Sequence, residues 1–310
     1  LAGFFVWKRE LRGATVRWIA VAFATALVVM NAYPFGMESN TLVLAVLHLP
    51  IALWLAIGIA YAGGRWNEVA RRMDFIRFSG ELFIYFVLLA LGGALLVGFT
   101  AMIFNAIGID IEPVMESWLV PCGLAGGVII ASWLVEAKQS VIENMAPVLT
   151  RLFTPFFAAA LLVFLVTLLV TGRGINVERG ALIAFDALLV VVLALFLYSI
   201  SARDPQAPPG IFDVVQVVLV VSALVANAFA LWAIVARIGE FGSTPNRLAA
   251  LGMNVILIVN LAWSAVLYVR FLRGRGGFAA LERWQTGYLP IYAAWAALVV
   301  VVFPLAFAFI

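Results

Sequence analysis

The sequence predicts an all-α protein, a polytopic bundle of about nine transmembrane helices. Hydrophobic residues make up 65% of the 310 residues, whereas soluble domains contain about 45–50%. Charged residues make up only 11%, less than half of the usual ~25%. Long apolar stretches alternate with loops, and most of the arginines fall in the loops on one side. Together these observations indicate one membrane-embedded unit rather than a set of soluble domains.

Nine stretches reach the roughly 20 apolar residues that a spanning helix needs. They are expected to be helical, because unpaired backbone amides in hydrocarbon cost on the order of several kcal/mol each. No stretch shows the alternating pattern of a membrane β-strand. The predicted spans are 16–34, 41–62, 82–107, 118–136, 154–171, 181–200, 213–235, 248–269 and 289–310.

The charges predict an orientation. If the residue 1 end lies in the cytoplasm and the loops alternate, all but four of the 19 Lys and Arg residues fall on the cytoplasmic side. Cytoplasmic loops of membrane proteins carry such an excess. We therefore expect a multi-pass protein with the residue 310 end outside the cytoplasm. The composition, with 17 arginines against two lysines and abundant Ala, Val, Leu and Gly, is typical of GC-rich bacterial sequences, so we expect the bacterial inner membrane, with the residue 310 end in the periplasm. The four outer cations are Arg173, Arg179, Arg237 and Arg247.

The chain is expected to divide at its Pro-rich loop. Residues 1–200 predict a six-span bundle, 201–212 a Pro-rich cytoplasmic loop, and 213–310 a three-span part. Apolar residues recur at helical spacing in 63–81 and 139–153, which predicts amphipathic cytoplasmic segments at the membrane surface. Both ends of the sequence are apolar, and we expect the chain to be an internal portion of a longer protein.

Small residues predict where helices approach each other. Glycines four residues apart let two helix backbones come close. The glycines that predict such contacts are Gly92, Gly93 and Gly98 in one span and Gly123, Gly126 and Gly127 in the next. The single cysteine, Cys122, excludes an internal disulfide and is expected to be a buried thiol.

Ionisable and amide side chains inside the predicted spans need a partner or a cavity, because they are costly in hydrocarbon. Asp186 is the clearest case. His48, Asn227, Asn254 and Asn260 also lie within predicted spans, and most of these residues fall in the outer half of the membrane. They predict a polar ligand-binding pocket open to the outside. The alternative is a structural role, since such contacts hold helices together by about 0.6–2 kcal/mol each.

The turn at 237–247 is the second candidate for ligand binding. Arg237, Glu240 and Arg247 would lie at its outer surface, where they could pair with each other or hold an anionic headgroup. Gly239 and Gly242 are suited to end the preceding helix. Thr244 and Pro245 are suited to begin the next one, as N-cap and first helical residue.

An outer loop contains three carboxylates, Asp110, Glu112 and Glu116. Carboxylates at this position could bind a divalent ion and a phosphate-linked donor, as in a membrane-embedded lipid-linked glycosyltransferase. A solvated loop edge is the alternative explanation.

The run Ala-Arg-Ile-Gly-Glu-Phe-Gly-Ser-Thr-Pro-Asn-Arg-Leu-Ala-Ala-Leu-Gly at 236–252 resembles a bacterial multi-pass family, the domain of unknown function 4153. The segments 254–260 and 146–155 add to the resemblance, which covers mainly 140–270. It implies an inner-membrane protein of unassigned activity, in which the helices of some relatives precede a soluble segment. It implies no catalytic residues.

No motif predicts catalysis, a cofactor or ATP hydrolysis. One histidine and one cysteine make a metal centre of these ligands improbable. The net charge of +3 does not predict nucleic-acid binding, because the arginines flank membrane spans. The expected partners are membrane lipids and other membrane or envelope subunits. Three functions remain open: binding or moving a lipid or small solute, a transferase that uses the outer carboxylates, and a structural subunit of a complex.

Overall fold

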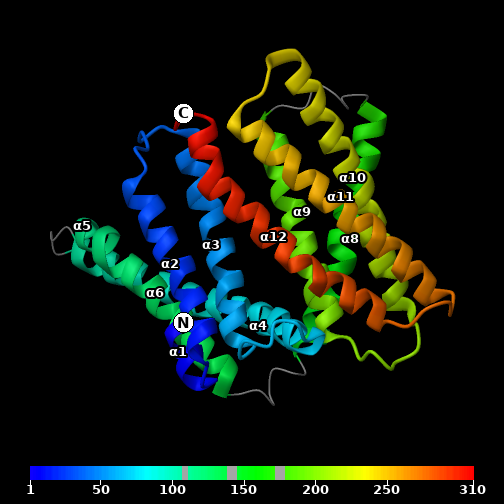
Figure 1. Cartoon of the computed structure of the whole chain (residues 1–310), viewed down its shortest axis with the longest axis horizontal. Helices are drawn as coiled ribbons and strands as arrows, with labels where there is room; N and C mark the ends of the chain where they lie inside the picture. The colour runs from blue at the N-terminus through cyan, green and yellow to red at the C-terminus, as the bar shows by residue number, and fades with distance from the viewer. Residues whose placement is uncertain (107–110, 138–144, 172–178) are drawn as a thin grey trace.

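The computed structural model describes residues 1–106, 111–137, 145–171 and 179–310, and these residues are helical with connecting loops and no strands (Figure 1). The elements are α1 (Ala2–Lys8), α2 (Gly13–Ala32), α3 (Asn40–Tyr61), α4 (Val69–Ala106), α5 (Glu112–Val114), the π-helix η1 (Met115–Leu119), α6 (Val120–Ala137), α8 (Met145–Thr171), α9 (Arg179–Ala202), α10 (Ile211–Phe241), α11 (Pro245–Leu272) and α12 (Ala279–Ala306).

Long helices occupy all nine predicted spans, and the prediction of an all-α membrane bundle is confirmed. Among the described residues, seven helices are long and apolar enough to cross a membrane. The other two predicted spans lie in α8 and α9, whose described apolar stretches are shorter, Thr150–Val163 and Asp186–Ala202. The protein is a multi-pass helical membrane protein.

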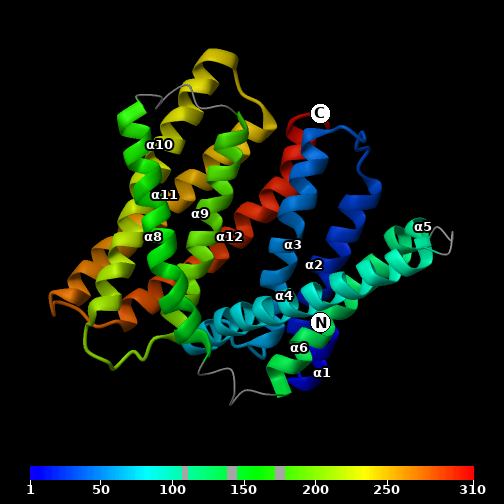
Figure 2. The same cartoon turned by 180° about the vertical axis from the view of Figure 1, so that it is seen from behind.

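The helices form two groups that α12 joins. α2 and α3 lie side by side in one group, and α8, α9, α10 and α11 form the other (Figures 1 and 2). α12 packs along α3 and also contacts α11. α4 and α6 run crosswise to α2 and α3, and the α5 tip of this hairpin points away from α8–α11 in both views. The two chain ends lie at opposite ends of the bundle.

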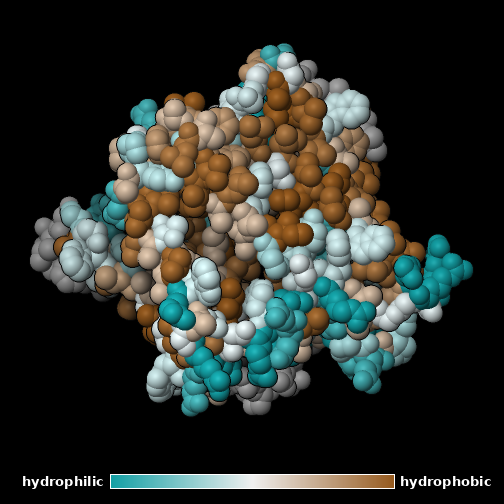
Figure 3. Space-filling model, viewed as in Figure 1, coloured by the Kyte–Doolittle hydropathy of each residue, from teal (hydrophilic) through white to brown (hydrophobic). Residues whose placement is uncertain are grey.

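Two large apolar cores, and a smaller one around Leu44 and Val299, hold these groups together. The larger one combines buried side chains of α4, α8, α9, α10, α11 and α12, such as Leu161, Phe196 and Leu219. The second packs α1 against α3, α4 and α6 around Phe5 and Phe78. Many other large apolar side chains are exposed on the outside of the helices, and apolar residues cover most of the face in Figure 3. An apolar outer surface of this kind is expected for helices that contact the hydrocarbon core of a membrane.

The predicted amphipathic segment at 63–81 is not a separate helix. From Val69 onward it is the first part of α4, which continues without a break to Ala106. Its apolar side is buried in the bundle at Met73 and Ile76. The second such segment, 139–153, lies in part outside the described residues, and its end is the first part of α8.

The predicted glycine contacts are largely wrong. A methyl group added at Gly92, Gly93, Gly98, Gly123 or Gly126 would meet no heavy atom within 4 Å, and only Gly127 has a neighbour, the Phe86 ring at 3.4 Å. The close approaches are elsewhere, at Gly58, Gly80 and Gly252, each of which lies under an aromatic ring. Cys122 is exposed rather than buried. The cause is the crosswise course of the α4–α6 hairpin, which leaves these faces without a neighbouring helix.

Candidate functional site

Three of the predicted polar residues meet inside the bundle. Asn254 of α11 donates from Nδ2 to Asp186 Oδ1 of α9 at 3.2 Å and to the Ala250 carbonyl oxygen at 2.8 Å. Asn227 of α10 donates from Nδ2 to the Asn254 carbonyl oxygen at 3.1 Å. Asn227 and Asn254 are 0% and 1% exposed. The amide oxygens of both side chains are buried without a hydrogen-bond partner.

His48, predicted to line the same pocket, has a local partner instead. Its Nδ1 lies 2.9 Å from the Leu44 carbonyl oxygen, one turn earlier in α3, which accepts the bond. The side chain is half-buried. Within the described residues, no hydrogen bond or ion pair connects His48 with Asp186, Asn227 or Asn254.

The turn between α10 and α11 is built largely as the sequence predicts. Thr244 is the N-cap of α11 and accepts from the Arg247 amide at 3.3 Å, and Pro245 is the first helical residue. Gly242 ends α10 with a φ of 75°, a conformation that favours glycine. Gly239 lies inside α10 and does not end it.

Arg247 stabilises this turn. Its Nη1 donates to the carbonyl oxygens of Phe241 (3.0 Å) and Gly242 (2.7 Å), at the C-terminal end of α10. A cation at a helix C-terminus interacts favourably with the helix dipole. In the described part of the chain, no ion pair joins Arg247 or Arg237 to Glu240.

The two carboxylates of the predicted carboxylate loop that the structure describes do not meet the buried cluster. Glu112 and Glu116 are exposed at the α5 tip, which points away from α9, α10 and α11 (Figure 2). Asp110 lies outside the described residues. The described residues contain no group of three or more His, Cys, Asp or Glu side chains placed to hold a metal ion.

A second buried polar cluster joins α11 and α12. Of its members, only Asn260 is singled out by the sequence. Gln285 donates from Nε2 to Asn260 Oδ1 at 3.0 Å, and Asn260 donates from Nδ2 to Gln285 Oε1 at 3.3 Å. The Ser264 hydroxyl accepts from Gln285 and donates to the Asn260 carbonyl oxygen. All three residues are 0% exposed, and each of these side-chain polar groups has a partner.

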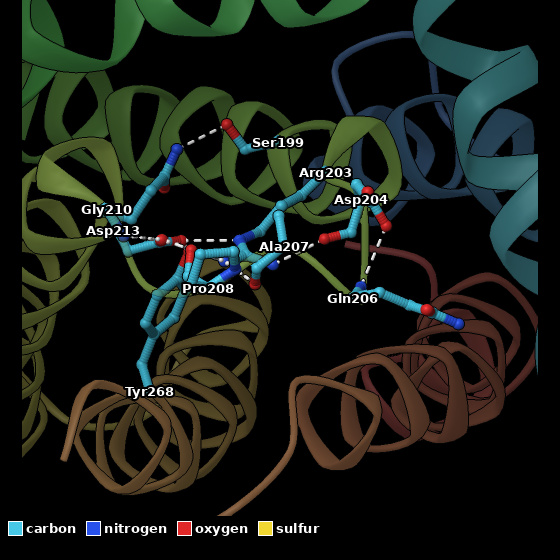
Figure 4. Close-up of polar contacts among 10 residues, drawn as sticks. Ser199, Arg203, Asp204, Gln206, Ala207, Pro208, Gly210, Asp213 and Tyr268 are labelled. Carbon is cyan, nitrogen blue, oxygen red and sulfur yellow. Dashed lines mark hydrogen bonds and ion pairs between the residues drawn. The ribbon is translucent and has the colours of Figure 1, made fainter. Parts of the chain in front are cut away.

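A third polar centre fixes the Pro-rich loop and was not predicted (Figure 4). Asp213 accepts four hydrogen bonds, from Arg203 Nε (2.8 Å), Arg203 Nη2 (3.1 Å), the Gly210 amide (2.8 Å) and the Tyr268 hydroxyl (3.0 Å). Arg203 also donates to three loop carbonyl oxygens and lies between the rings of Phe271 and Phe278. The loop is therefore tied to α10 and α11. Arginine and aspartate flanking a proline run were the available sequence signal.

An apolar groove lies between α2 and α12, with α3 as its floor. Its volume is about 480 Å³, and the hollow is visible between the two helices in Figure 3. Small side chains from α2, α3 and α12 leave this space, and Trp66 contributes to its wall next to the start of α4. The small residues of its wall are Ala22, Thr25, Ala26, Ala52, Ala56, Ala293 and Ala297.

Arg72 lies beside this groove. It donates from Nη1 to the Trp66 carbonyl oxygen at 2.7 Å and from Nη2 to the Thr286 hydroxyl at 3.3 Å. Leu289 and Pro290, one turn after Thr286, line the groove. Arg72 Nε is buried without a partner, and no carboxylate forms an ion pair with Arg72 in the part of the chain that the structure describes.

Comparisons with known proteins give no relative from which a function could be transferred. No model of a known protein family, no curated protein and no solved structure matches this chain.

Proposed function

We propose that this multi-pass membrane protein binds a phospholipid, with an acyl chain in the groove between α2, α3 and α12 and the phosphate at Arg72. The observation that carries the proposal is an apolar groove of about 480 Å³ that lies next to an arginine without an acidic partner among the described residues. Ligand sites typically measure about 300–1,000 Å³ and combine apolar walls with a few polar groups.

The groove alone would bind an acyl chain weakly. Lipid tails are as apolar as leucine, so transfer of a chain from the bilayer into the groove gains little from the hydrophobic effect. Its small side chains supply space and close packing. Selection among lipids therefore has to come from the headgroup.

Arg72 is suited to hold that headgroup. Arginine has five N–H donors, and among the described residues only Trp66 and Thr286 accept from it. Arginine binds phosphate with paired hydrogen bonds, and basic pockets between membrane helices bind lipid headgroups. Neighbouring Arg71 differs, because its Nε lies 3.8 Å from Glu68 and its charge is already paired.

Native mass spectrometry of the full chain in mild detergent tests the proposal. We expect retained phospholipid, and stronger retention of anionic phosphatidylglycerol than of phosphatidylcholine. Ala297→Trp places an indole in the groove and is expected to remove the lipid. Ala294→Trp is the matched control, because Ala294 is also exposed on α12 but does not line the groove.

The headgroup contact has its own variants. Arg72→Gln is expected to weaken phosphatidylglycerol binding about tenfold, which corresponds to the ~1.4 kcal/mol of one charge-assisted hydrogen bond. Arg72→Lys should retain part of the affinity, and Arg71→Gln should behave as wild type. Equal lipid retention by wild type, Ala297→Trp and Arg72→Gln would show that the groove does not bind lipid.

We further propose the bacterial inner membrane, with the residue 1 end in the cytoplasm. Two observations support the orientation, the uneven distribution of cations, with four of the 19 on the outer side, and the position of the chain ends at opposite ends of the bundle. The choice of a bacterial inner membrane rests on the resemblance of the 236–252 run. A chain with Cys122 replaced by alanine tests the orientation. Cysteine at Ser243 should react with an impermeant reagent in intact cells, and cysteine at Arg275 only after permeabilisation. The reverse labelling would contradict the proposed orientation.

A further inference from the structure

The cluster of Asp186, Asn227 and Asn254 differs from the lipid groove in both place and chemistry. It joins α9, α10 and α11, whereas the groove is formed by α2, α3 and α12. Its buried groups without a partner are two amide oxygens, whereas the groove is apolar. The cluster and the groove are therefore two independent candidate sites.

The cluster lies at membrane depth. Asp186 is seven residues into α9, about 10 Å along the helix at 1.5 Å per residue. Asn254 is nine residues into α11, about 14 Å, and Asn227 is near the middle of α10. A hydrocarbon core is about 30 Å thick, so all three positions fall inside it.

A carboxylate at this depth requires compensation. Charged side chains within membrane spans pair with each other, face a polar cavity or mark an ion pathway. Among the residues that the structure describes, no Lys, Arg or His forms an ion pair with Asp186. Its one described polar partner is Asn254 Nδ2, which is a neutral donor.

Hydrogen bonds from the side-chain nitrogens fix the orientation of the Asn227 and Asn254 amide groups. Asn227 Nδ2 is held by the Asn254 carbonyl oxygen, and Asn254 Nδ2 is shared between Asp186 and Ala250. Rotating either amide to satisfy its oxygen would break these bonds. Asn227 Oδ1 and Asn254 Oδ1 therefore stay buried without a donor, although nearly all buried polar atoms in proteins have a partner.

We propose that Asp186, Asn227 and Asn254 form a binding site for an alkali-metal cation. A proton on Asp186 would supply one donor and leave at least one amide oxygen unsatisfied. A metal cation can be bound by the carboxylate and by both amide oxygens, since carboxylate and carbonyl oxygens are the ligands of hard cations. The single carboxylate balances one positive charge, and this selects a monovalent cation over Ca²⁺ or Mg²⁺.

Sodium chloride, titrated against choline chloride at constant total chloride, is the probe for the full chain in detergent. Sodium that binds only the folded state raises the unfolding temperature. We expect a rise of a few degrees for the wild type and at least a tenfold loss of apparent sodium affinity in Asp186→Asn. Glu38→Gln is the control, because it removes an exposed carboxylate in the loop between α2 and α3 and should leave the sodium response unchanged.

A direct binding measurement covers the case in which Asp186→Asn does not fold. The wild type is expected to retain ²²Na⁺ that unlabelled sodium displaces and choline does not. Absence of such retention overturns the proposal. So does a sodium response that is equal in wild type and Asp186→Asn, or a stability that depends on pH but not on sodium, which would indicate protonation of Asp186 alone.

Discussion

Two polar clusters that share helix α11 differ in completeness. In the Asn260–Ser264–Gln285 cluster the two amides bond each other in both directions, and the hydroxyl has its own partners. In the Asp186–Asn227–Asn254 cluster two amide oxygens have none. A complete network fixes the packing of the helices around it. The two unsatisfied amide oxygens belong to side chains that are just as buried, and they are the groups that the proposed cation would bind.

The Arg203–Asp213 centre belongs to the complete class and predicts the largest effect. Arg203→Gln leaves the Asp213 carboxylate, 4% exposed, without its cation. Breaking a buried ion pair from one side costs about 3–5 kcal/mol. We expect a fall in the unfolding temperature of roughly 10 °C in mild detergent, at about 2–4 °C per kcal/mol.

Arg275→Gln provides the comparison for that variant, because Arg275 is exposed in the loop before α12. Its unfolding temperature should match that of the wild type. The double variant Arg203→Gln/Asp213→Asn should recover part of the loss, because it removes the unpaired charge. A single variant Arg203→Gln as stable as Arg275→Gln would show that the loop is not held by this pair.

The Asn260 cluster predicts the next effect. Asn260→Leu leaves both polar atoms of the Gln285 amide short of a partner at 0% exposure. An unsatisfied buried polar group costs about 1–3 kcal/mol. Adding Gln285→Leu removes the orphaned amide, so the double variant should be more stable than Asn260→Leu alone. Additive losses in thermal unfolding would contradict a coupled pair.

The same exchange in the incomplete cluster should cost less. Asn227→Leu removes one hydrogen bond, to the Asn254 carbonyl oxygen, together with one unsatisfied oxygen. We expect the free energy of unfolding to change by no more than about 1 kcal/mol in sodium-free buffer. The lost hydrogen bond destabilises the protein, and removal of the unsatisfied buried oxygen stabilises it by a similar amount. A loss as large as that of Asn260→Leu, measured in parallel, would remove the distinction between the two clusters.

The sequence predicts the membrane class and the long helices well, because hydrocarbon imposes length and apolarity on every span. It also predicts the Thr244–Pro245 helix start, because capping depends on neighbouring residues only. The sequence also singles out Asp186, Asn227 and Asn254, since each is polar within a predicted span, and the structure brings the three together. Which of these residues contact each other depends on which helices are neighbours, and the sequence does not predict that.

Tertiary arrangement explains what the sequence does not predict. His48 resembles Asp186 as an isolated polar residue in a span, yet its carbonyl partner lies one turn away. The spacing of Gly123 and Gly127 predicts a close helix contact, whereas the close contacts form at Gly80 and Gly252 under aromatic rings of other helices. Arg203 and Asp213 flank the proline run in the sequence, but their pairing depends on how the Pro-rich loop folds back.

The α4–α6 hairpin has the fewest close contacts at its glycines, and we expect substitutions there to change stability least. Gly126 has no heavy atom within 4 Å of the position of an added methyl group. Gly126→Ala should therefore change stability by at most about 0.5–1 kcal/mol, in the stabilising direction, because alanine favours the helix. Gly126→Leu should be tolerated for the same steric reason, whereas Gly252→Ala places a methyl group 2.0 Å from the Trp295 ring and should destabilise. If thermal unfolding and size-exclusion chromatography instead show that Gly126→Leu lowers stability or reduces the size of the assembly, this face of α6 is covered by a second protein surface.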